Sequence, residues 1–501
     1  MTQDQHIQVC VSKYSEQSKQ DYRVRLTSSV TSIRFLLRQG LAFRGNDETL
    51  DSLNWGNFLE FLKVLADTNE DVGKVVMQNA PENHQMTSPL IQKDIVNAIA
   101  SETTEIIIND LGEELFGIIV DESRDVSLKE QMIVFIRYVN SSGHIVERML
   151  GITHVRDTTS MSLKVAIEDL LTRHGLSISR IRGQGYDGAS NMRGKFNGLK
   201  TLIINENPCA FYVHCFAHQL QLALVGAARE NSAVGNFFVT VSQLCNIVCA
   251  PCKRKDSLRD KQLKMLIDSI STDTIEIGIG LNQESVIKRL GDTRWGSHYG
   301  ALVSIVRLFS PVIEVLDEIG VNDGPKQRTE AFGVLEAILC FDFVFFLHLM
   351  KDVLGITNDL SQALQKKDQN IVSAIRLLEI NQLQTYFVDV TSDPVFSKLG
   401  GINELAQKMV ETGRHLDYTL VYLLLKLSLI LPVATASVER AFSAMKLIKT
   451  SLRNRMGDDL LHDCLLPYVK KEVFDQVSNE AILLRFQNMR ERRGVLPRSL
   501  S

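Results

Sequence analysis

The sequence predicts a mixed α/β sheet domain that is interrupted by a large all-α segment and preceded by a helical region. Three observations lead to this class. Residues 28–112 show helical spacing of apolar side chains and almost no strand signal, residues 115–213 contain short β-rich runs, and the strand signal nearly vanishes from 216 to about 430. A chain of 501 residues is long enough for two or three domains, since domains commonly run ~100–200 residues.

The N-terminal region, residues 1–112, contains one clearly predicted helix. Pro89 and Leu90 open it, and Gly112 stands just past its end, where helices commonly stop. Between them, side chains suited to a buried face recur at steps of three and four residues, at Ile95, Ala98, Ile99 and Thr103. These steps predict a helix that ends near Gly112.

The next stretch, residues 113–215, has the pattern of a sheet with two helices. We expect helices at Ser160–His174 and Gly194–Ile204, and strands at Leu115–Val120, Met132–Val139, Ile145–Val155, Ile178–Tyr186 and Phe211–Val213. The turn signal Asn140–Gly143 predicts a hairpin between the second and third strands. The helix after the third strand acts as a crossover, so the fourth strand can lie parallel to the first.

Two aspartates stand at the ends of these strands. Asp121 follows the first apolar strand, and Asp187 follows the fourth. Open α/β sheets place their sites at the carboxyl ends of neighbouring parallel strands, so we expect the two carboxylates to lie close together. They would repel each other unless a cation bridges them. The alternative is that each aspartate only caps the turn or helix that follows it.

Three sequence blocks carry a resemblance to a known family. They are the strand that ends in Asp121, the block Gly185–Met192 and the C-terminal block Ala436–Ser443. In this order they resemble the hAT superfamily of cut-and-paste DNA transposases. Within that superfamily they most resemble the zinc-finger MYM-type and TTF-type transposase-like proteins. The resemblance covers roughly residues 20–470 and implies a ribonuclease-H-like sheet domain that is split by an all-α insertion.

The resemblance also sets the expected domain boundaries. Residues 113–215 and 418–475 would form the first and last parts of the ribonuclease-H-like domain, with residues 216–417 as the all-α insertion between them. The last part would contain the family's C-terminal dimerisation region, and residues 476–501 would be a C-terminal tail.

The resemblance implies that Asp121, Asp187 and Glu439 form an acidic triad for DNA cleavage and strand transfer. Carboxylate oxygens suit Mg²⁺ or Mn²⁺, and two such ions ~3.5–4 Å apart can activate the attacking oxygen and stabilise the leaving oxygen. Asp121 would bridge both ions, while Asp187 and Glu439 would hold one each. Glu122 and Asp125 are nearby carboxylates that the motif does not select.

The alternative for Glu439 is a solvated residue or a member of a capping box. A capping box needs Ser or Thr three positions before the glutamate. Ala436 stands at that position, and Thr435 lies one residue too early. The spacing therefore favours a role in the site.

Two further residues, Cys215 and His218, resemble the family's Cys-x-x-His element just after the fifth strand. A structural zinc site needs four ligands, and so a second pair of them. The only candidates are Cys245, Cys249 and Cys252. We therefore expect Cys215 and His218 to pack against or orient the catalytic sheet.

Residues with DNA-binding chemistry occur in two places. The block Gly291–Tyr299 resembles the tryptophan block of the hAT insertion domain, where an aromatic side chain stacks on a displaced base. Trp295 would stack, and Arg294 could hold a phosphate; the alternative is a core tryptophan. Around the glutamate helix, Arg440, Lys446 and Lys449 could position phosphates, or they could form a solvated helix face.

Composition and charge narrow the function classes. The net charge of −4 argues against a bulk polyanion binder, so DNA contacts must come from local patches. Eight scattered cysteines indicate a reduced intracellular compartment. Residues 1–20 lack the apolar core of a signal peptide, and no uninterrupted apolar run reaches the ~18 residues of a spanning helix. We expect a soluble intracellular protein with no membrane partner, and the resemblance implies the nucleus.

Two functions remain open. Family members usually begin with a Cys/His-rich zinc finger, but residues 1–60 contain only Cys10 and His6. We therefore expect the finger to be absent and Met1–Lys19 to be a remnant spacer. The intact triad favours an active hAT-type transposase. The missing finger favours a catalytically silent, domesticated or truncated derivative that acts as a nuclear dimerisation or interaction protein.

The C-terminal segment Leu423–Val469 predicts self-association. Its apolar side chains occupy more than one helical face, at Leu424, Leu427, Leu431, Val438, Phe442, Met445, Leu460, Leu461, Leu465 and Leu466. A single helical hairpin cannot bury all of them. We expect a homodimer or higher homo-oligomer through this region; the alternative is packing within one chain.

Overall fold

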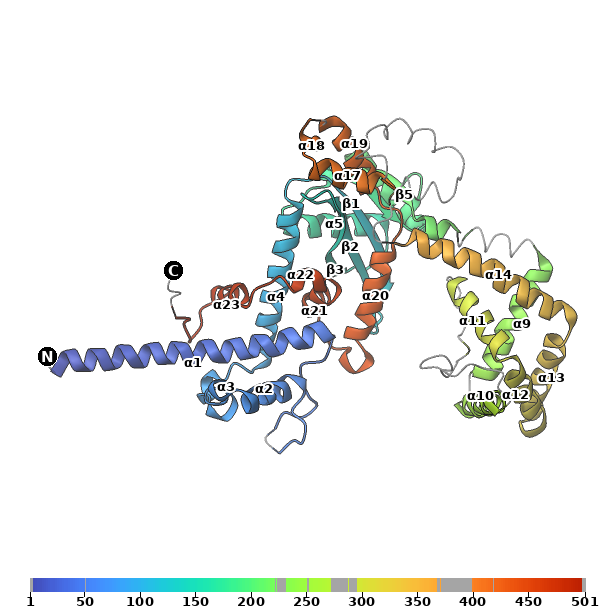
Figure 1. Cartoon of the computed structure of the whole chain (residues 1–501), viewed down its shortest axis with the longest axis horizontal. Helices are drawn as coiled ribbons and strands as arrows, with labels where there is room; N and C mark the ends of the chain where they lie inside the picture. Colours follow the sequence, from blue (N-terminus) through green and yellow to red (C-terminus); the bar gives the residue numbers. More distant parts are fainter. Residues whose placement is uncertain are drawn as a thin grey trace. The chain divides into compact units, whose positions relative to one another are not determined.

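The computed structural model describes most of the chain. The described residues are 3–49, 51–220, 222, 231–249, 252–271, 287, 295–366, 370, 399–417 and 419–497. They divide into two compact units (Figure 1). Unit 1 comprises Met1–Cys215 and Lys367–Ser501, and unit 2 comprises Phe216–Lys366.

Unit 1 is built on one five-stranded mixed sheet of order β3-β2-β1-β4-β5. The strands are β1 Phe116–Arg124, β2 Glu130–Val139, β3 Ile145–His154, β4 Ile181–Tyr186 and β5 Phe211–His214. β1 pairs with β2, and β2 with β3, in antiparallel fashion, whereas β1 pairs with β4, and β4 with β5, in parallel. The predicted hairpin, the crossover helix α5 (Ser160–Arg173) and the parallel return of the fourth strand are confirmed.

Two local details of the sheet differ from the prediction. β1 does not end before Asp121 but continues to Arg124, because it keeps pairing with β2 after its register with β4 has ended at Ile119 and Gly185. The predicted helix Gly194–Ile204 begins later, as α7 (Leu199–Glu206), and a turn with two glycines separates it from the short helix α6 (Ser190–Arg193).

Helices from both ends of the chain complete unit 1. Ser88 caps the predicted helix, α4, by accepting a hydrogen bond from the Ile91 backbone N–H. α1 begins at Gln3, so the segment expected to be a spacer is mostly helical. The N-terminal elements are α1 Gln3–Gln39, α2 Asn57–Thr68, α3 Glu70–Gly73, 3₁₀ turns at Met77–Asn79 and Glu82–His84, and α4 Pro89–Leu111.

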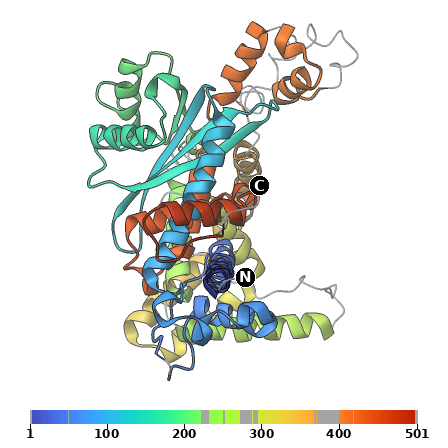
Figure 2. The same cartoon turned by 90° about the vertical axis from the view of Figure 1, so that its left-hand side faces the viewer.

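The C-terminal elements are α17 Ile402–Glu411, α18 Arg414–Asp417, α19 Thr419–Ile430, α20 Ala436–Ile448, a 3₁₀ turn at Ser451–Arg453, α21 Asp458–Val469, α22 Lys471–Phe474 and α23 Asn479–Asn488. α19 and α20 contact β1, β2 and β4, whereas α21 lies against β3 and α4. Figure 2 shows the last of these helices, α21 to α23, in red, beside the blue α4.

A single hydrophobic core joins the N-terminal helices, the sheet and the C-terminal helices. Its members include Leu26, Ile33, Ile95, Ile99, Ile119, Val134, Met445, Leu465 and Phe486. The segment 476–501, expected to be a tail, contains α23, which packs against α1 and α4 and buries Ile482, Leu483 and Phe486. Arg485 of the same helix pairs with Glu102 and Glu105 of α4. Residues of α1 and α23 are therefore part of the sheet domain's own core.

Unit 2 is helical in all the elements that the structure describes. They are α9 Ser232–Cys249, α10 Cys252–Ser271, α11 Trp295–Arg307, α12 Phe309–Asn322, α13 Pro325–Ile338 and α14 Phe341–Leu364. These helices share a separate core that includes Val241, Leu244, Ile305, Val315 and Leu347. Unit 2 ends earlier than the insertion that we expected, because α17 and α19 pack on unit 1, where Ala406, Leu429 and Ile430 meet Val139.

Helix α9 is long and apolar enough to cross a membrane by composition, with a mean hydropathy of 1.4. Two bent helix pairs, His298–Arg307 with Phe309–Asn322 and Pro325–Ile338 with Phe341–Leu364, pass the same test. The apolar side chains of α9 have another use in this fold, since Val241 and Leu244 are fully buried in the core of unit 2. The absence of a membrane partner stays a prediction.

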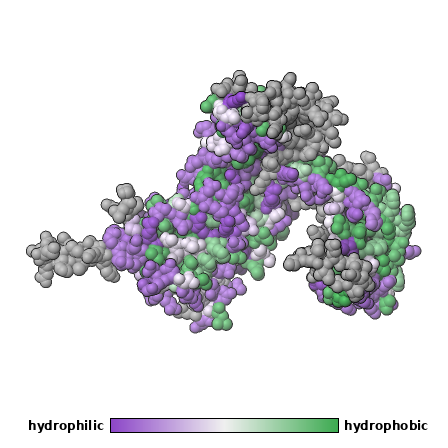
Figure 3. All heavy atoms as spheres, in the orientation of Figure 1, coloured by the Kyte–Doolittle hydropathy of each residue, from purple (hydrophilic) through white to green (hydrophobic). Residues whose placement is uncertain are grey.

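Unit 2 also exposes large apolar side chains along α13 and α14 (Figure 3). Phe341 and Phe345 are 80% and 50% exposed, while Phe343 and Leu347 of the same helix are buried. α14 therefore carries apolar residues on two faces and buries one of them in the core of unit 2.

Candidate acidic site of unit 1

The alternation of side chains along the strands places Asp121 and Asp187 toward the same face of the sheet. Gly117 and Asp121 of β1 share one face, because residues two apart in a strand point the same way. A Cβ atom on Gly117 would point at the Ile430 carbonyl, and one on Gly185 would point at Pro432. Asp187 follows Gly185 by two positions, so both aspartates belong to the face that α19 and α20 cover.

Glycine at these strand positions lets the chain before α20 lie directly on the sheet. A Cβ atom on Gly185 would stand 2.7 Å from the Pro432 side chain, which is closer than two carbon atoms can approach. Any larger residue would push the segment Ile430–Pro432 away from β4. Since this segment leads into α20, the strand glycines set how near Glu439 comes to the two aspartates.

Glu439 lies in the first turn of α20, where the partial positive charge of a helix N-terminus favours a carboxylate. Thr435 is the N-cap residue, and its hydroxyl lies 3.4 Å from Glu439 Oε1 and 3.6 Å from Cys215 Sγ. Thr435 and Cys215 are both buried. This chain of contacts ties the glutamate to the end of β5.

The charges of the carboxylates act on one another. Burial, followed by the negative charges of Asp187, Glu122 and Glu439, raises the pKa of Asp121 to about 8. A single hydrogen bond of 3.0 Å from the Glu122 backbone N–H to Asp121 Oδ1 acts in the opposite direction. The charges of Asp187 and Glu439 thus both act on Asp121, although the whole of unit 2 separates Glu439 from the two aspartates in sequence.

Asp187 combines a capping contact with its place at the site. Its Oδ1 accepts a hydrogen bond of 3.0 Å from the Ala189 backbone N–H, as a turn-capping aspartate does. The Tyr212 hydroxyl donates to the Asp187 carbonyl at 3.1 Å. Capping and site membership are therefore compatible, because capping occupies one oxygen of the carboxylate.

Asn191, from the motif block that follows Asp187, holds the neighbouring Glu122. Its Nδ2 donates to Glu122 Oε1 at 3.0 Å and to the Thr158 carbonyl at 2.8 Å. Burial is the main reason that the pKa of Glu122 is raised, and the bond from Asn191 opposes that rise. Sequence reasoning did not identify this contact, because Glu122 and Asn191 lie in different sequence blocks.

Lys449, which we expected to contact DNA, is buried instead. Its Nζ lies 2.7 Å from Asp125 Oδ2, and the two side chains are 1% and 0% exposed. Gln131 Nε2 also donates to Asp125, at 3.1 Å. Although burial opposes it, these hydrogen bonds hold the pKa of Asp125 below its ordinary value. Lys449 therefore joins the end of α20 to the turn after β1 and has no surface to offer to a phosphate.

The beginning of α20 is held by a second charged cluster. Ser437 donates to Glu147 of β3, which also pairs with the buried Arg137 at 2.5 Å. Arg137 Nε donates to the Leu429 carbonyl at 2.9 Å. Together with the Lys449 pair, this cluster fixes both ends of the helix that carries Glu439.

Of the other basic candidates, Arg440 and Lys446 are exposed. Arg440 donates to Ser437 at 2.9 Å. His218 lies in the helical residues 216–220 of unit 2 and is partly buried. Arg294 lies outside the described residues, and Trp295 is described only as the first residue of α11, without its side chain.

Whether the acidic residues suit a divalent cation depends on donors and charge. All the donors are hard oxygens, and the negative charges near Asp121 raise its pKa, an effect that a bound cation would oppose. In the part of the chain that the structure describes, no three His, Cys, Asp or Glu side chains form a ready metal-binding group. The oxygen donors fit Mg²⁺ or Mn²⁺. Because no ready group is formed, binding would require the acidic side chains to move closer together.

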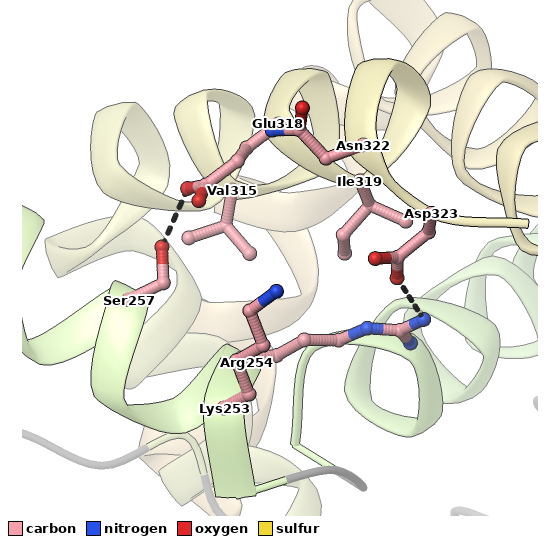
Figure 4. Close-up of a pocket in the computed structure, with 8 residues that line it drawn as sticks. All are labelled: Lys253, Arg254, Ser257, Val315, Glu318, Ile319, Asn322 and Asp323. Atoms are coloured by element: carbon pink, nitrogen blue, oxygen red, sulfur yellow. Dashed lines mark hydrogen bonds and ion pairs between the residues drawn. The ribbon is translucent and has the colours of Figure 1, made fainter.

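Unit 2 has a small cavity of its own, of about 210 Å³, between α10 and α12 (Figure 4). Arg254 spans it to reach Asp323 at 2.7 Å, and Ser257 donates to Glu318 at 2.7 Å. Lys253 lines the same cavity. These pairs join the two helices, so the cavity is explained by the packing of unit 2.

Unit 1 combines a five-stranded mixed sheet with C-terminal helices that follow unit 2 in the sequence, which is the α/β architecture expected of a ribonuclease-H-like domain. Comparisons with protein families agree with this class. Residues 1–198 match the family model described as "ZMYM1/FAM200, RNase-like domain", and residues 410–473 match the "hAT family C-terminal dimerisation region". Two separate parts of the chain thus match domains of the hAT-related, transposase-like proteins.

Two curated relatives are similar over much of this chain. The human "52 kDa repressor of the inhibitor of the protein kinase" is 22% identical over 329 residues, which are 64% of this chain and 41% of that protein. The mouse protein of the same name is 22% identical over 332 residues, with the same coverage. The chain thus matches about two fifths of the length of these relatives.

Proposed function

We propose that this chain is a hAT-type transposase-like protein whose acidic site performs metal-dependent cleavage and strand transfer on DNA in the nucleus. The observation that supports this most strongly is that burial, together with the negative charges of Asp187, Glu122 and Glu439, raises the pKa of Asp121 to about 8. A fold that gathers like charges from three distant segments bears a cost in stability. Gathered carboxylates of this kind are typical of functional sites.

In this proposal each acidic residue has a separate task. Bound Mg²⁺ or Mn²⁺ would activate the attacking oxygen and neutralise the phosphate. Asp121, on the central strand, would help to hold both cations, while Asp187 and Glu439 would each hold one of them. Thr435 and Cys215 would orient the Glu439 carboxylate through the contacts at its Oε1 side. Exposed Arg440 and Lys446 would contact the DNA backbone.

The second hypothesis is a catalytically silent derivative that acts through protein association. It is favoured by one observation, namely that the curated relatives are named for repression. Both hypotheses keep the fold and the dimerisation region. They differ in whether the acidic site still cuts DNA.

A cleavage assay separates them. With Mn²⁺ or Mg²⁺ and supercoiled plasmid DNA, we expect nicking by the native chain. Asp121→Asn, Asp187→Asn and Glu439→Gln should each lower the rate by about a thousandfold, since losing several kcal/mol of charge stabilisation corresponds to that ratio. The buried carboxyl of Asp463, held by Asn97 outside the site, provides a control, and Asp463→Asn should cleave normally.

The outcome decides between the two hypotheses. A native chain that binds the cation without cleaving any DNA would favour the silent derivative. If one of the three variants cleaves as fast as the native chain, that residue is not part of the active site.

The dimerisation region offers a separate prediction about association. Intrachain packing buries most of its apolar surplus, including Val438, Met445, Leu461 and Leu465. Five leucines of the matched region stay exposed by 38–95%: Leu416, Leu423, Leu424, Leu447 and Leu452. We expect these to meet a second copy of the chain, because the region matches a dimerisation model.

Light scattering at micromolar concentration should therefore give the mass of at least two chains. At least one of the double variants Leu416→Glu/Leu424→Glu and Leu447→Glu/Leu452→Glu should give a monomer, since charges opposed across an apolar contact are costly. Leu263→Glu in α10, at a position 59% exposed, is the matched control. A monomeric native chain would refute self-association.

A further inference from the structure

We propose that Phe196 and the cations around it form a stacking site for an unpaired base of a DNA strand that enters the acidic site. The proposal extends the proposed function, because it names the form of DNA that the site receives. It concerns the turn between α6 and α7, which follows Asp187 in the sequence.

Phe196 is presented to solvent by a well-braced turn. Its side chain is 80% exposed, whereas Met192 and Leu199 on either side of the turn are buried. The Gly198 backbone N–H donates to the Gly194 carbonyl at 3.0 Å, and the Thr201 hydroxyl donates to the same carbonyl at 2.9 Å. A Cβ atom on Gly198 would stand 2.8 Å from Gly194 Cα, so the two glycines permit this tight closure. Such bracing keeps an exposed aromatic ring in place.

Three cations lie in or next to this turn, one beside the Phe196 ring and two near Tyr212. Lys195 Nζ lies 6.0 Å from the centre of the Phe196 ring, and Lys200 Nζ lies 5.0 Å from the centre of the Tyr212 ring. The positive charge of Arg193 also acts on the Tyr212 hydroxyl. Within the described part of the chain, none of the three forms an ion pair, so their charges remain available to a ligand.

The same group of residues adjoins the acidic site. The Tyr212 hydroxyl donates to the Asp187 carbonyl at 3.1 Å, and Asn191 of α6 holds Glu122. A strand whose phosphates rest on Arg193, Lys195 and Lys200 would thus pass beside Asp187. The net charge of the chain is −4. A local group of cations beside the acidic site therefore indicates that the ligand is negatively charged.

The chemistry of the group indicates a single strand. Exposed aromatic rings stack on any base, because every base has a π-face, while flanking cations follow the backbone phosphates. In duplex DNA the base faces are covered by their neighbours, so Phe196 could stack only on a base that has left the helix. The inferred ligand is therefore unpaired DNA.

The test uses Phe196→Trp as an internal probe in the full chain, with EDTA present so that cleavage is excluded. Adding a single-stranded oligodeoxythymidine should quench the emission of the new tryptophan, with the native chain as the baseline for Trp55 and Trp295. Phe196→Ala should weaken binding by about 5- to 150-fold, the ratio for one stacked base. Phe196→Trp should bind as tightly as the native chain.

Matched controls make the result specific. Phe341→Ala removes a ring that is equally exposed, at 80%, in unit 2 and should leave binding unchanged. Lys195→Ala should reduce the dependence of binding on salt by about 0.7 in the logarithmic slope. Because binding is measured without metal, loss of cleavage alone cannot imitate a loss of stacking.

Three results would overturn the inference. They are unchanged binding by Phe196→Ala, unchanged emission at saturating single strand, and equal dependence on Phe196 for a duplex of the same sequence. Tighter binding of the corresponding RNA, with the same dependence on Phe196, would overturn the assignment to DNA. If stacking is found and the chain cleaves no DNA, the stacking site is supported and the proposed catalytic function is refuted.

Discussion

Replacing Lys449 by methionine should lower the free energy of unfolding of unit 1 by about 3–5 kcal/mol. Lys449 and Asp125 form an ion pair whose side chains are 1% and 0% exposed. Removing the cation would leave the Asp125 carboxylate buried without its main partner. An unpaired buried charge costs far more than an ion pair at the surface contributes.

Urea unfolding can measure this loss within unit 1. Trp55 belongs to unit 1 and Trp295 to unit 2, so a Trp295→Phe background isolates the emission of Trp55. Lys446→Met is the matched control, because Lys446 stands on the same helix but is exposed. It should change the free energy of unfolding by less than about 0.5 kcal/mol.

A double variant tests the cause. In Asp125→Asn/Lys449→Met the amide oxygen can still accept the Ser127 and Lys129 backbone N–H groups, which now donate at 2.7 and 3.1 Å. With no charge left to bury, more than half of the lost stability should return. A double variant as unstable as Lys449→Met would show that packing, and not the unpaired charge, causes the loss.

The second large effect concerns Asp121 and pH. In the folded chain its pKa is about 8, against an ordinary value of 3.8. Between these two values the folded state holds a proton that the unfolded chain has released, so its stability falls as the pH rises from about 4 to 8. The shift corresponds to a loss on the order of 5 kcal/mol. Asp121→Asn should remove this slope and be more stable than the native chain at pH 8 without metal.

A divalent cation should reverse the native chain's loss at pH 8. At a concentration of 100 times Kd, Mn²⁺ would add ~2.7 kcal/mol to the native chain and nothing to Asp121→Asn. Asp463→Asn serves as the control, since Asp463 is another buried carboxyl, with a pKa of about 6, and it should leave the cation effect intact. Thermal unfolding curves with and without Mn²⁺ measure all three. A native chain that gains no stability from the cation would refute the metal site.

Much of the sheet could be predicted from local patterns. The hairpin signal at Asn140–Gly143 and the crossover helix were sufficient to predict that β2 pairs with β3 and that β4 lies parallel to β1. The strand limits were less accurate, because Asp121 and Glu122 are polar and yet continue β1 through pairing with β2. Pairing with a neighbouring strand is not visible in the hydropathy of one segment.

The assignments that failed depended on burial. A lysine at the end of a helix is usually solvated, so we expected Lys449 to be available to DNA. The residues after 475 were expected to be a C-terminal tail. Their actual partners, Asp125 for Lys449 and α1 and α4 for α23, are hundreds of residues away in the sequence. No local pattern indicates such a partner.

By itself, the sequence determined the element types and the hAT resemblance, because these depend on spacing and motif along the chain. It also predicted the three carboxylates of the candidate site. The tertiary structure alone decided how those carboxylates act on one another. Gly117 and Gly185 admit the segment before α20 onto the sheet, and buried charges fix both ends of that helix. The physical reason is that close approach and desolvation arise only between segments brought together by folding, as Glu439 is brought to Asp121 across unit 2.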